Sequence, residues 1–116
     1  MSLLSDFRKT FGPSDILRWN NASATTSGDN TIIAAVTGKK IRVLAFYMSP
    51  ASAVNLKWTS STTSDLTKLF YMANASIPVV FPLNPAGWFE TVAGELLGAN
   101  LSGSVVVSTG GLYITI

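Results

Sequence analysis

The chain has 116 residues, with 8 Lys and Arg against 6 Asp and Glu, so its formal net charge is +2. It contains no cysteine and no histidine. These two absences exclude a disulfide framework, a thiol nucleophile, a histidine-based catalytic triad and an ordinary zinc, iron–sulfur or haem site. We therefore expect no metal ion and no cofactor.

The length fits one domain that buries enough surface to fold without staples. Only 12% of the residues are charged, about half the usual share, while 47% are hydrophobic, which excludes a disordered chain. This apolar excess has two explanations. Either the protein assembles into something larger, or a small β domain is solvated by Ser and Thr in place of charged residues.

The basic residues are scattered, and the one cluster is Lys39-Lys40-Ile41-Arg42. In a strand these side chains alternate between faces, which does not build a phosphate-binding groove, so we expect no nucleic-acid partner. No run of 18 apolar residues is present, which predicts no transmembrane helix and no membrane partner. The first residues lack the pattern of a secretory signal, so we expect a protein made in the cytoplasm.

Residues 1–15 differ from the rest of the chain. Leu3, Leu4, Phe7 and Phe11 have the spacing of a short amphipathic helix, and a Gly-Pro break follows. Such a segment either packs on its own domain or forms an arm that reaches a neighbouring subunit.

From residue 16 onward the pattern is that of β-strands separated by Gly, Pro, Asn, Ser and Thr clusters. The predicted strands are 16–20, 31–36, 39–49, 54–59, 66–73, 77–83, 88–92, 95–101 and 105–116, with polar loops at 21–30 and 60–65. Residues 54–59 alternate most cleanly. Two prolines in 77–83 predict an edge strand or a strand that switches sheets, and Gly110-Gly111 predicts a bulge or bend. Short strands at this spacing predict a single-domain, all-β antiparallel sandwich or jelly roll over residues 16–116.

The sequence offers few candidate catalytic residues. Glu90 and Glu95 are the only closely spaced acids, and they flank a turn. A glycosidase needs two carboxylates across a cleft, but two solvated turn residues explain this pair more simply. Nucleophile elbows, phosphate-binding loops and calcium loops are absent from the sequence. We therefore predict that the protein is not an enzyme.

The aromatic residues are the remaining candidates for a binding surface. Trp19, Tyr47, Trp58, Tyr71, Trp88 and Phe89 could line a platform for a sugar ring. Trp58 is in phase with Val54 and Leu56, which predicts a core position. Trp88 and Phe89 follow a turn, and adjacent strand residues face opposite ways, so one of the two should be exposed or in contact with a partner.

Two segments carry a resemblance to a known group of proteins. Residues 36–46 (VTGKKIRVLAF) and 81–102 (FPLNPAGWFETVAGELLGANLS) resemble small structural proteins of tailed bacteriophages and prophages. In that group a Gly-Lys-Lys-Ile-Arg-Val-Leu strand is followed some way along by Asn-Pro-x-Gly-x-Phe-Glu-Thr-x-x-Gly-Glu. The resemblance extends over about residues 30–116 and is greatest to capsid decoration, or cement, proteins.

The resemblance implies a mechanical role at the capsid surface of the virion. Copies of the sandwich, as homotrimers, would sit on the assembled head, bind the phage major capsid protein and stabilise the shell. The candidate contact residues are Leu3, Leu4, Phe7 and Phe11 in the arm, and Trp88 and Phe89 in the sandwich.

Two other functions remain open. The first is a receptor- or carbohydrate-binding head domain of a tail fibre or baseplate, although the two polar loops offer only Asp29 and Asp65 for a cation-assisted sugar site. The second is a small head–tail or tail-tube protein, which would self-assemble into rings or tubes.

Overall fold

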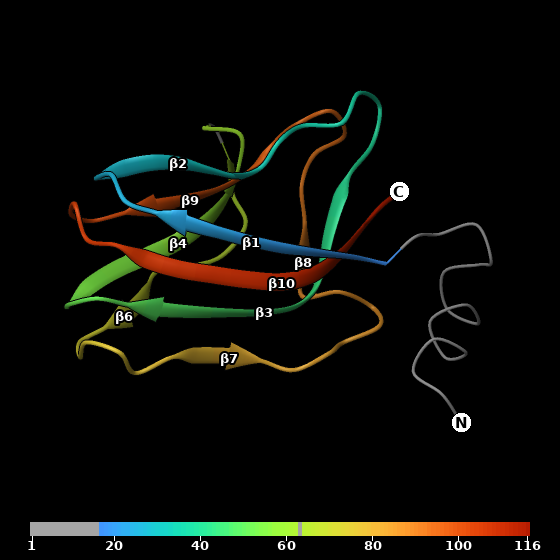
Figure 1. Cartoon of the computed structure of the whole chain (residues 1–116). Helices are drawn as coiled ribbons and strands as arrows, with labels where there is room; N and C mark the ends of the chain where they lie inside the picture. The colour runs from blue at the N-terminus through green and yellow to red at the C-terminus, as the bar shows by residue number, and fades with distance from the viewer. Residues whose placement is uncertain (1–16, 63) are drawn as a thin grey trace.

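Two antiparallel β-sheets make up the part of the chain that the computed structural model describes, residues 17–62 and 64–116 (Figure 1). No helix occurs within those residues. The strands are β1 (Arg18–Ala24), β2 (Gly28–Ile33), β3 (Ile41–Pro50), β4 (Val54–Ser60), β5 (Ser64–Asp65), β6 (Phe70–Met72), β7 (Val79–Phe81), β8 (Phe89–Glu90), β9 (Leu97–Leu101) and β10 (Val107–Thr115). The prediction of an all-β sandwich is confirmed.

We call sheet A the one with the order β1-β10-β3-β7, in which β8 also pairs with β3. Sheet B has the order β2-β9-β4-β5, in which β6 also pairs with β4. Figure 1 shows β10 lying between β1 and β3. The chain crosses from one sheet to the other after β1, β2, β3, β6, β8 and β9. This repeated crossing between two packed antiparallel sheets is the order of a jelly roll.

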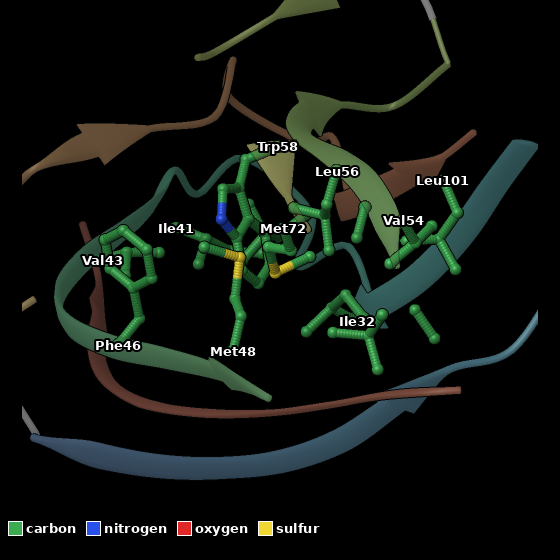
Figure 2. Packing of buried hydrophobic residues seen from close by; sticks show 14 residues of the cluster. Ile32, Ile41, Val43, Phe46, Met48, Val54, Leu56, Trp58, Met72 and Leu101 are labelled. Carbon is green, nitrogen blue, oxygen red and sulfur yellow. The ribbon is translucent and has the colours of Figure 1, made fainter. Parts of the chain in front are cut away.

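The main core lies between the two sheets and follows from the alternation of side chains along each strand. In β4, Val54, Leu56 and Trp58 are buried, while Asn55 and Lys57 point outward. Figure 2 shows the β4 side chains directed toward those of β3 and β2. The other buried members are Ala24, Ile32, Ile41, Val43, Phe46, Met48, Met72, Leu97, Ala99, Leu101 and Val107. The predicted core position of Trp58 is confirmed.

A bulge in β3 changes the phase of sheet A. The register with β10 shifts between Leu112 and Tyr113, which leaves Leu44 without an opposite residue. Leu44 packs with Ile114 in a second, smaller buried cluster, separate from the main core. Of the bulge or bend predicted at residues 110–111, the bulge is wrong in place, because both glycines pair regularly with β3 and the register shifts only after Leu112.

The loop predicted at residues 21–30 is also wrong in extent. Strand β1 continues to Ala24 and β2 begins only four residues later. The Asn30 side chain closes the connection, because its Oδ1 accepts hydrogen bonds from the backbone N–H groups of Thr25 (3.2 Å) and Thr26 (3.1 Å). The connection is therefore a short turn held by one amide side chain, and not the long loop that the sequence predicts.

Several strands are shorter than the sequence suggests. The segments expected at 66–73, 77–83 and 88–92 contribute only β6, β7 and β8, and β5 lies in the expected loop at 60–65. Strand β7 lies between Pro78 and Pro82 at an edge of sheet A, which confirms the edge prediction.

The predicted N-terminal arm, residues 1–15 with Leu3, Leu4, Phe7 and Phe11, lies outside the described residues. Across the described ranges, we find no helix with the length and apolar character needed to cross a membrane.

Candidate protein-contact surface

The adjacent aromatic residues Trp88 and Phe89 differ in their contacts and in their exposure. Phe89 of β8 packs into the core, with its ring centroid 5.3 Å from that of Phe46 and 5.8 Å from that of Trp58. Trp88 lies just before β8 and is 40% exposed. Of the two, Trp88 is the one that a partner can reach.

The exposed Trp88 ring is held in place by its neighbours. It packs edge-to-face on Phe81, with centroids 4.9 Å apart, and its Nε1–H donates a hydrogen bond to the carbonyl oxygen of Pro82 (2.8 Å). Because the one polar atom of the indole is satisfied within the chain, the surface that Trp88 offers is apolar. An aromatic side chain that is already fixed loses little conformational freedom on binding, and tryptophan is enriched at the energetic centres of protein interfaces.

A tight turn before β8 positions Trp88. Asn84 closes the turn through its side chain, which accepts from the Ala86 N–H (3.0 Å) and donates to the Gly87 carbonyl (3.3 Å). Gly87 has a positive φ of 86°, and a Cβ added there would lie 2.6 Å from Cγ of Arg42. Both the backbone conformation and the space therefore require glycine. The following N–H, that of Trp88, then rejoins β3.

Part of the second segment that carries the phage resemblance lies beside the first: residues 84–94 run along residues 39–44 of the β3 region, whereas β9 of the second segment lies in sheet B. The backbone N–H groups of Asn84, Trp88, Thr91 and Gly94 donate to the carbonyls of Leu44, Val43, Ile41 and Lys39, at 2.8, 2.8, 3.0 and 2.8 Å. In return, Thr91 Oγ1 accepts from the buried Ile41 N–H (2.9 Å). The Asn, Gly and Thr residues of the segment that carries the resemblance therefore have a structural role, because their hydrogen bonds join the β8 region to β3.

The two candidate acids bind different partners. Glu90 Oε2 lies 3.2 Å from Nη2 of Arg42, and Glu95 Oε1 accepts from the hydroxyl of Ser60 (2.7 Å). Ser60 is fully buried and also accepts from the Val92 N–H (2.9 Å). Each carboxylate is thus part of a local structural contact. The described residues hold no group of three or more acidic side chains suited to a metal ion.

A second exposed aromatic surface lies on the outer face of sheet A. Trp19 of β1 is 56% exposed, and its ring centroid is 6.5 Å from that of Tyr47 in β3. Val80 of β7 pairs with Tyr47 and is 65% exposed. These side chains border a shallow groove, which we call the Trp19 groove; its lining is Trp19, Ala45, Phe46, Tyr47, Val80, Phe81, Gly110 and Gly111.

The outer face of sheet B differs in character. Asp29, Asn100, Lys57 and Asp65 form a polar row across four strands, with Asn100 Nδ2 donating to Asp29 (2.9 Å) and Lys57 Nζ 3.1 Å from Asp65. Tyr71 of β6, 76% exposed, is a large exposed aromatic on this sheet. Sheet A thus presents Trp19, Val80 and Trp88, whereas the middle of sheet B presents charged and amide groups.

Neither a protein-family model nor a curated protein matches this chain. The candidate surfaces therefore rest on the geometry of the chain itself. The sequence identified Trp19, Tyr47 and Trp88 as aromatic candidates one by one. It did not predict that β1, β3 and β7 bring Trp19, Tyr47 and Val80 together, because the order of strands within a sheet has no local signal.

Proposed function

We propose that the chain is a non-enzymatic structural protein of a bacteriophage virion, a decoration or cement protein that binds the assembled head and stabilises it. Two observations support this proposal. Residues 36–46 and 81–102 resemble small phage structural proteins, and backbone hydrogen bonds join residues 39–44 of the first segment to residues 84–94 of the second. The jelly-roll order is also one that viral capsid domains use, although a fold does not by itself specify a function.

The observation that carries the proposal is Trp88. A large apolar ring, held by Phe81 and the Pro82 carbonyl and still 40% exposed, has the character of an anchor for a protein partner. In this proposal Trp88 contacts the major capsid protein or a neighbouring copy within a homotrimer. Phe89, the other candidate, packs on Phe46 and Trp58 in the core.

The role would be mechanical. A protein that binds the assembled lattice, and not its free subunits, stabilises the shell by mass action. At a free concentration of about 100 times the dissociation constant, each occupied site adds about 2.7 kcal/mol against disassembly. Spread over many sites at the seams between capsid subunits, this opposes the outward pressure of packaged DNA.

The test is a binding measurement with shells of the phage or prophage that encodes the chain, prepared without this protein. Co-sedimentation gives the affinity, and electron microscopy shows whether added density lies at symmetry axes. We expect the full chain to bind and Trp88→Ala to bind at least about tenfold more weakly, the loss of one anchor of about 1.4 kcal/mol or more.

Tyr71→Ala is the matched control, because Tyr71 is an exposed aromatic on the other sheet. It should bind as the unaltered chain does. Phe89→Ala is not informative, because Phe89 packs on Phe46 and Trp58 and its loss would disturb the core. A strictly monomeric chain without affinity for the shells would refute the proposal.

The predicted arm needs its own variant. Deleting residues 2–12 should weaken shell binding or change the oligomeric state, measured by light scattering. An unchanged oligomeric state together with unchanged shell binding would remove residues 1–15 from the proposed mechanism.

A further inference from the structure

Two aromatic rings form a small platform in the Trp19 groove. The planes of the Trp19 and Tyr47 rings meet at 31°, with centroids 6.5 Å apart, so the two rings form a shallow angled surface. Gly110 of β10 lies between them, and a Cβ added there would lie 2.3 Å from Cε1 of Tyr47. The missing side chain therefore lets the Tyr47 ring lie down against the sheet. Val80 borders the platform on the β7 side.

A row of neutral polar groups adjoins this platform on the same face. Asn21 of β1 pairs with Gly110 of β10. Two residues further along the strands, Ser23 of β1 pairs with Ser108 of β10. These three side chains and Tyr47 line a polar depression next to the groove. The Tyr47 hydroxyl donates to Asn21 Oδ1 at 3.5 Å, a long contact at an exposed position. Both groups can exchange that contact for a stronger bond to a ligand.

The charge of the site narrows the ligand class. Every described residue that lines the groove or the adjoining depression is uncharged. A nucleic acid or another anion would meet no Lys or Arg there. Apolar side chains laid over the depression would take the Asn21, Ser23 and Ser108 groups out of water without giving them partners, which disfavours their binding.

A neutral sugar ring matches both halves of the site. One face of a pyranose carries polarised C–H groups that are attracted to the negative face of an aromatic ring. Its edge carries hydroxyls that can bond to amide and hydroxyl side chains. A concave surface with aromatic walls and a few convergent polar groups is also typical of small-ligand sites. We propose that the Trp19 groove binds a neutral glycan, with one pyranose on Trp19 and Tyr47 and its hydroxyls toward Asn21, Ser23 and Ser108.

This proposal is independent of the head-binding role, because it uses Trp19 in β1 and not Trp88. A protein that coats a virion can carry a second surface for the glycans of a host cell. Failure of one proposal leaves the other untouched, since each has its own tryptophan variant.

The experiment begins with the full chain on an array of neutral and sialylated glycans. We expect binding to one or more neutral glycans. Trp19→Ala should weaken that binding at least about tenfold, and Trp88→Ala should leave it unchanged. Binding to none of the neutral glycans, or binding that survives Trp19→Ala, would overturn the proposal.

A second measurement locates the sugar on the protein. The chain has three tryptophans, and each gives one indole N–H signal in a nitrogen–proton NMR spectrum. Methyl glycosides of glucose, galactose and mannose are titrated into the full chain, and single Trp→Phe variants assign the signals. The Trp19 signal should move with at least one sugar. The signals of the buried Trp58 and of Trp88, which is bonded to Pro82, should stay still.

Other occupants of the groove give a different result. If a second copy of the chain or its own residues 1–16 covered the groove, no sugar would move the Trp19 signal. For a second copy, the signal would instead change with protein concentration, and Trp19→Ala would alter the oligomeric state. Either outcome refutes the glycan proposal.

Discussion

Two neighbouring glycines in β10 should respond very differently to the same substitution. In Gly110→Ala the added methyl group would meet Cε1 of Tyr47 at 2.3 Å, and in Gly111→Ala it would meet the backbone oxygen of Ala45 at 2.3 Å. The Tyr47 ring is a partly exposed side chain that can rotate away. The backbone of β3 cannot, because β3 lies between β10 and β7 in the middle of sheet A.

The magnitudes follow from these two neighbours. Overpacking costs about 1–3 kcal/mol, and replacing glycine by alanine within a strand returns about 0.5–1 kcal/mol. For Gly110→Ala, where the ring moves, we expect a net loss of about 1 kcal/mol or less. For Gly111→Ala, where strand pairing must shift, the overpacking cost should exceed the usual range, and we expect a net loss of about 3 kcal/mol. For about 100 ordered residues, 1 kcal/mol corresponds to about 5 °C in Tm, so the two variants should differ by about 10 °C.

A double-mutant cycle tests whether the Tyr47 ring is the group that Gly110→Ala displaces. Tyr47→Ala removes the ring that Gly110→Ala would displace, so the two changes together should cost about 1 kcal/mol less than their sum. With Gly111→Ala the same Tyr47→Ala change should be additive within about 0.5 kcal/mol. Urea unfolding, followed by circular dichroism, gives the free energies. A Gly111→Ala variant as stable as the unaltered chain, or one rescued by Tyr47→Ala, would refute this account.

Three further substitutions test buried polar groups, each by urea unfolding. Thr91→Val should cost about 1–3 kcal/mol, because the buried Ile41 N–H loses its acceptor while the side-chain volume is kept; a neutral result would contradict the bond. Ser60→Ala should cost about 1–3 kcal/mol, since one backbone N–H and one carboxylate lose a buried partner. Ser102→Ala, its exposed control, should stay within about 0.5 kcal/mol. Trp58→Phe should cost less than about 1.5 kcal/mol, because the buried Nε1–H has no hydrogen-bond partner among the described residues. A loss of about 3 kcal/mol or more, the size expected for truncation to alanine, would show that this N–H group does have a partner.

The parts of the fold that the sequence predicts are those determined by the residues of a single strand. The alternation of Val54, Leu56 and Trp58 identifies β4 and its buried face without knowledge of any other strand. Pro78 and Pro82 likewise identify an edge, because a proline nitrogen cannot donate to a neighbour. Local chemistry is enough in both cases.

The parts that the sequence misses depend on partners far along the chain. The bulge at Leu44 arises from how β3 pairs with β10, about 70 residues later, and nothing near Leu44 indicates it. The short connection between β1 and β2 depends on the bonds of a single side chain, Asn30. A run of Asn, Ser and Thr has the composition of a loop. In the structure the small residues between them, Ala22 and Ala24, face the core as in a strand.

The candidate sites follow the same division. That one of Trp88 and Phe89 faces outward is predictable from strand geometry. Which one does so depends on the turn at Asn84 and Gly87, and the Trp19 groove depends on the order of three strands.

The residues that carry the phage resemblance and the residues that could bind a partner are largely different sets. Asn84, Gly87 and Thr91 close turns and pair with β3, so they specify how the β8 region attaches to sheet A. Trp19 and Trp88 each leave a large apolar ring in contact with water, although Trp88 also packs on Phe81 and donates to the Pro82 carbonyl. Because folding alone does not require such exposure, these two rings are the positions at which substitution should separate function from stability.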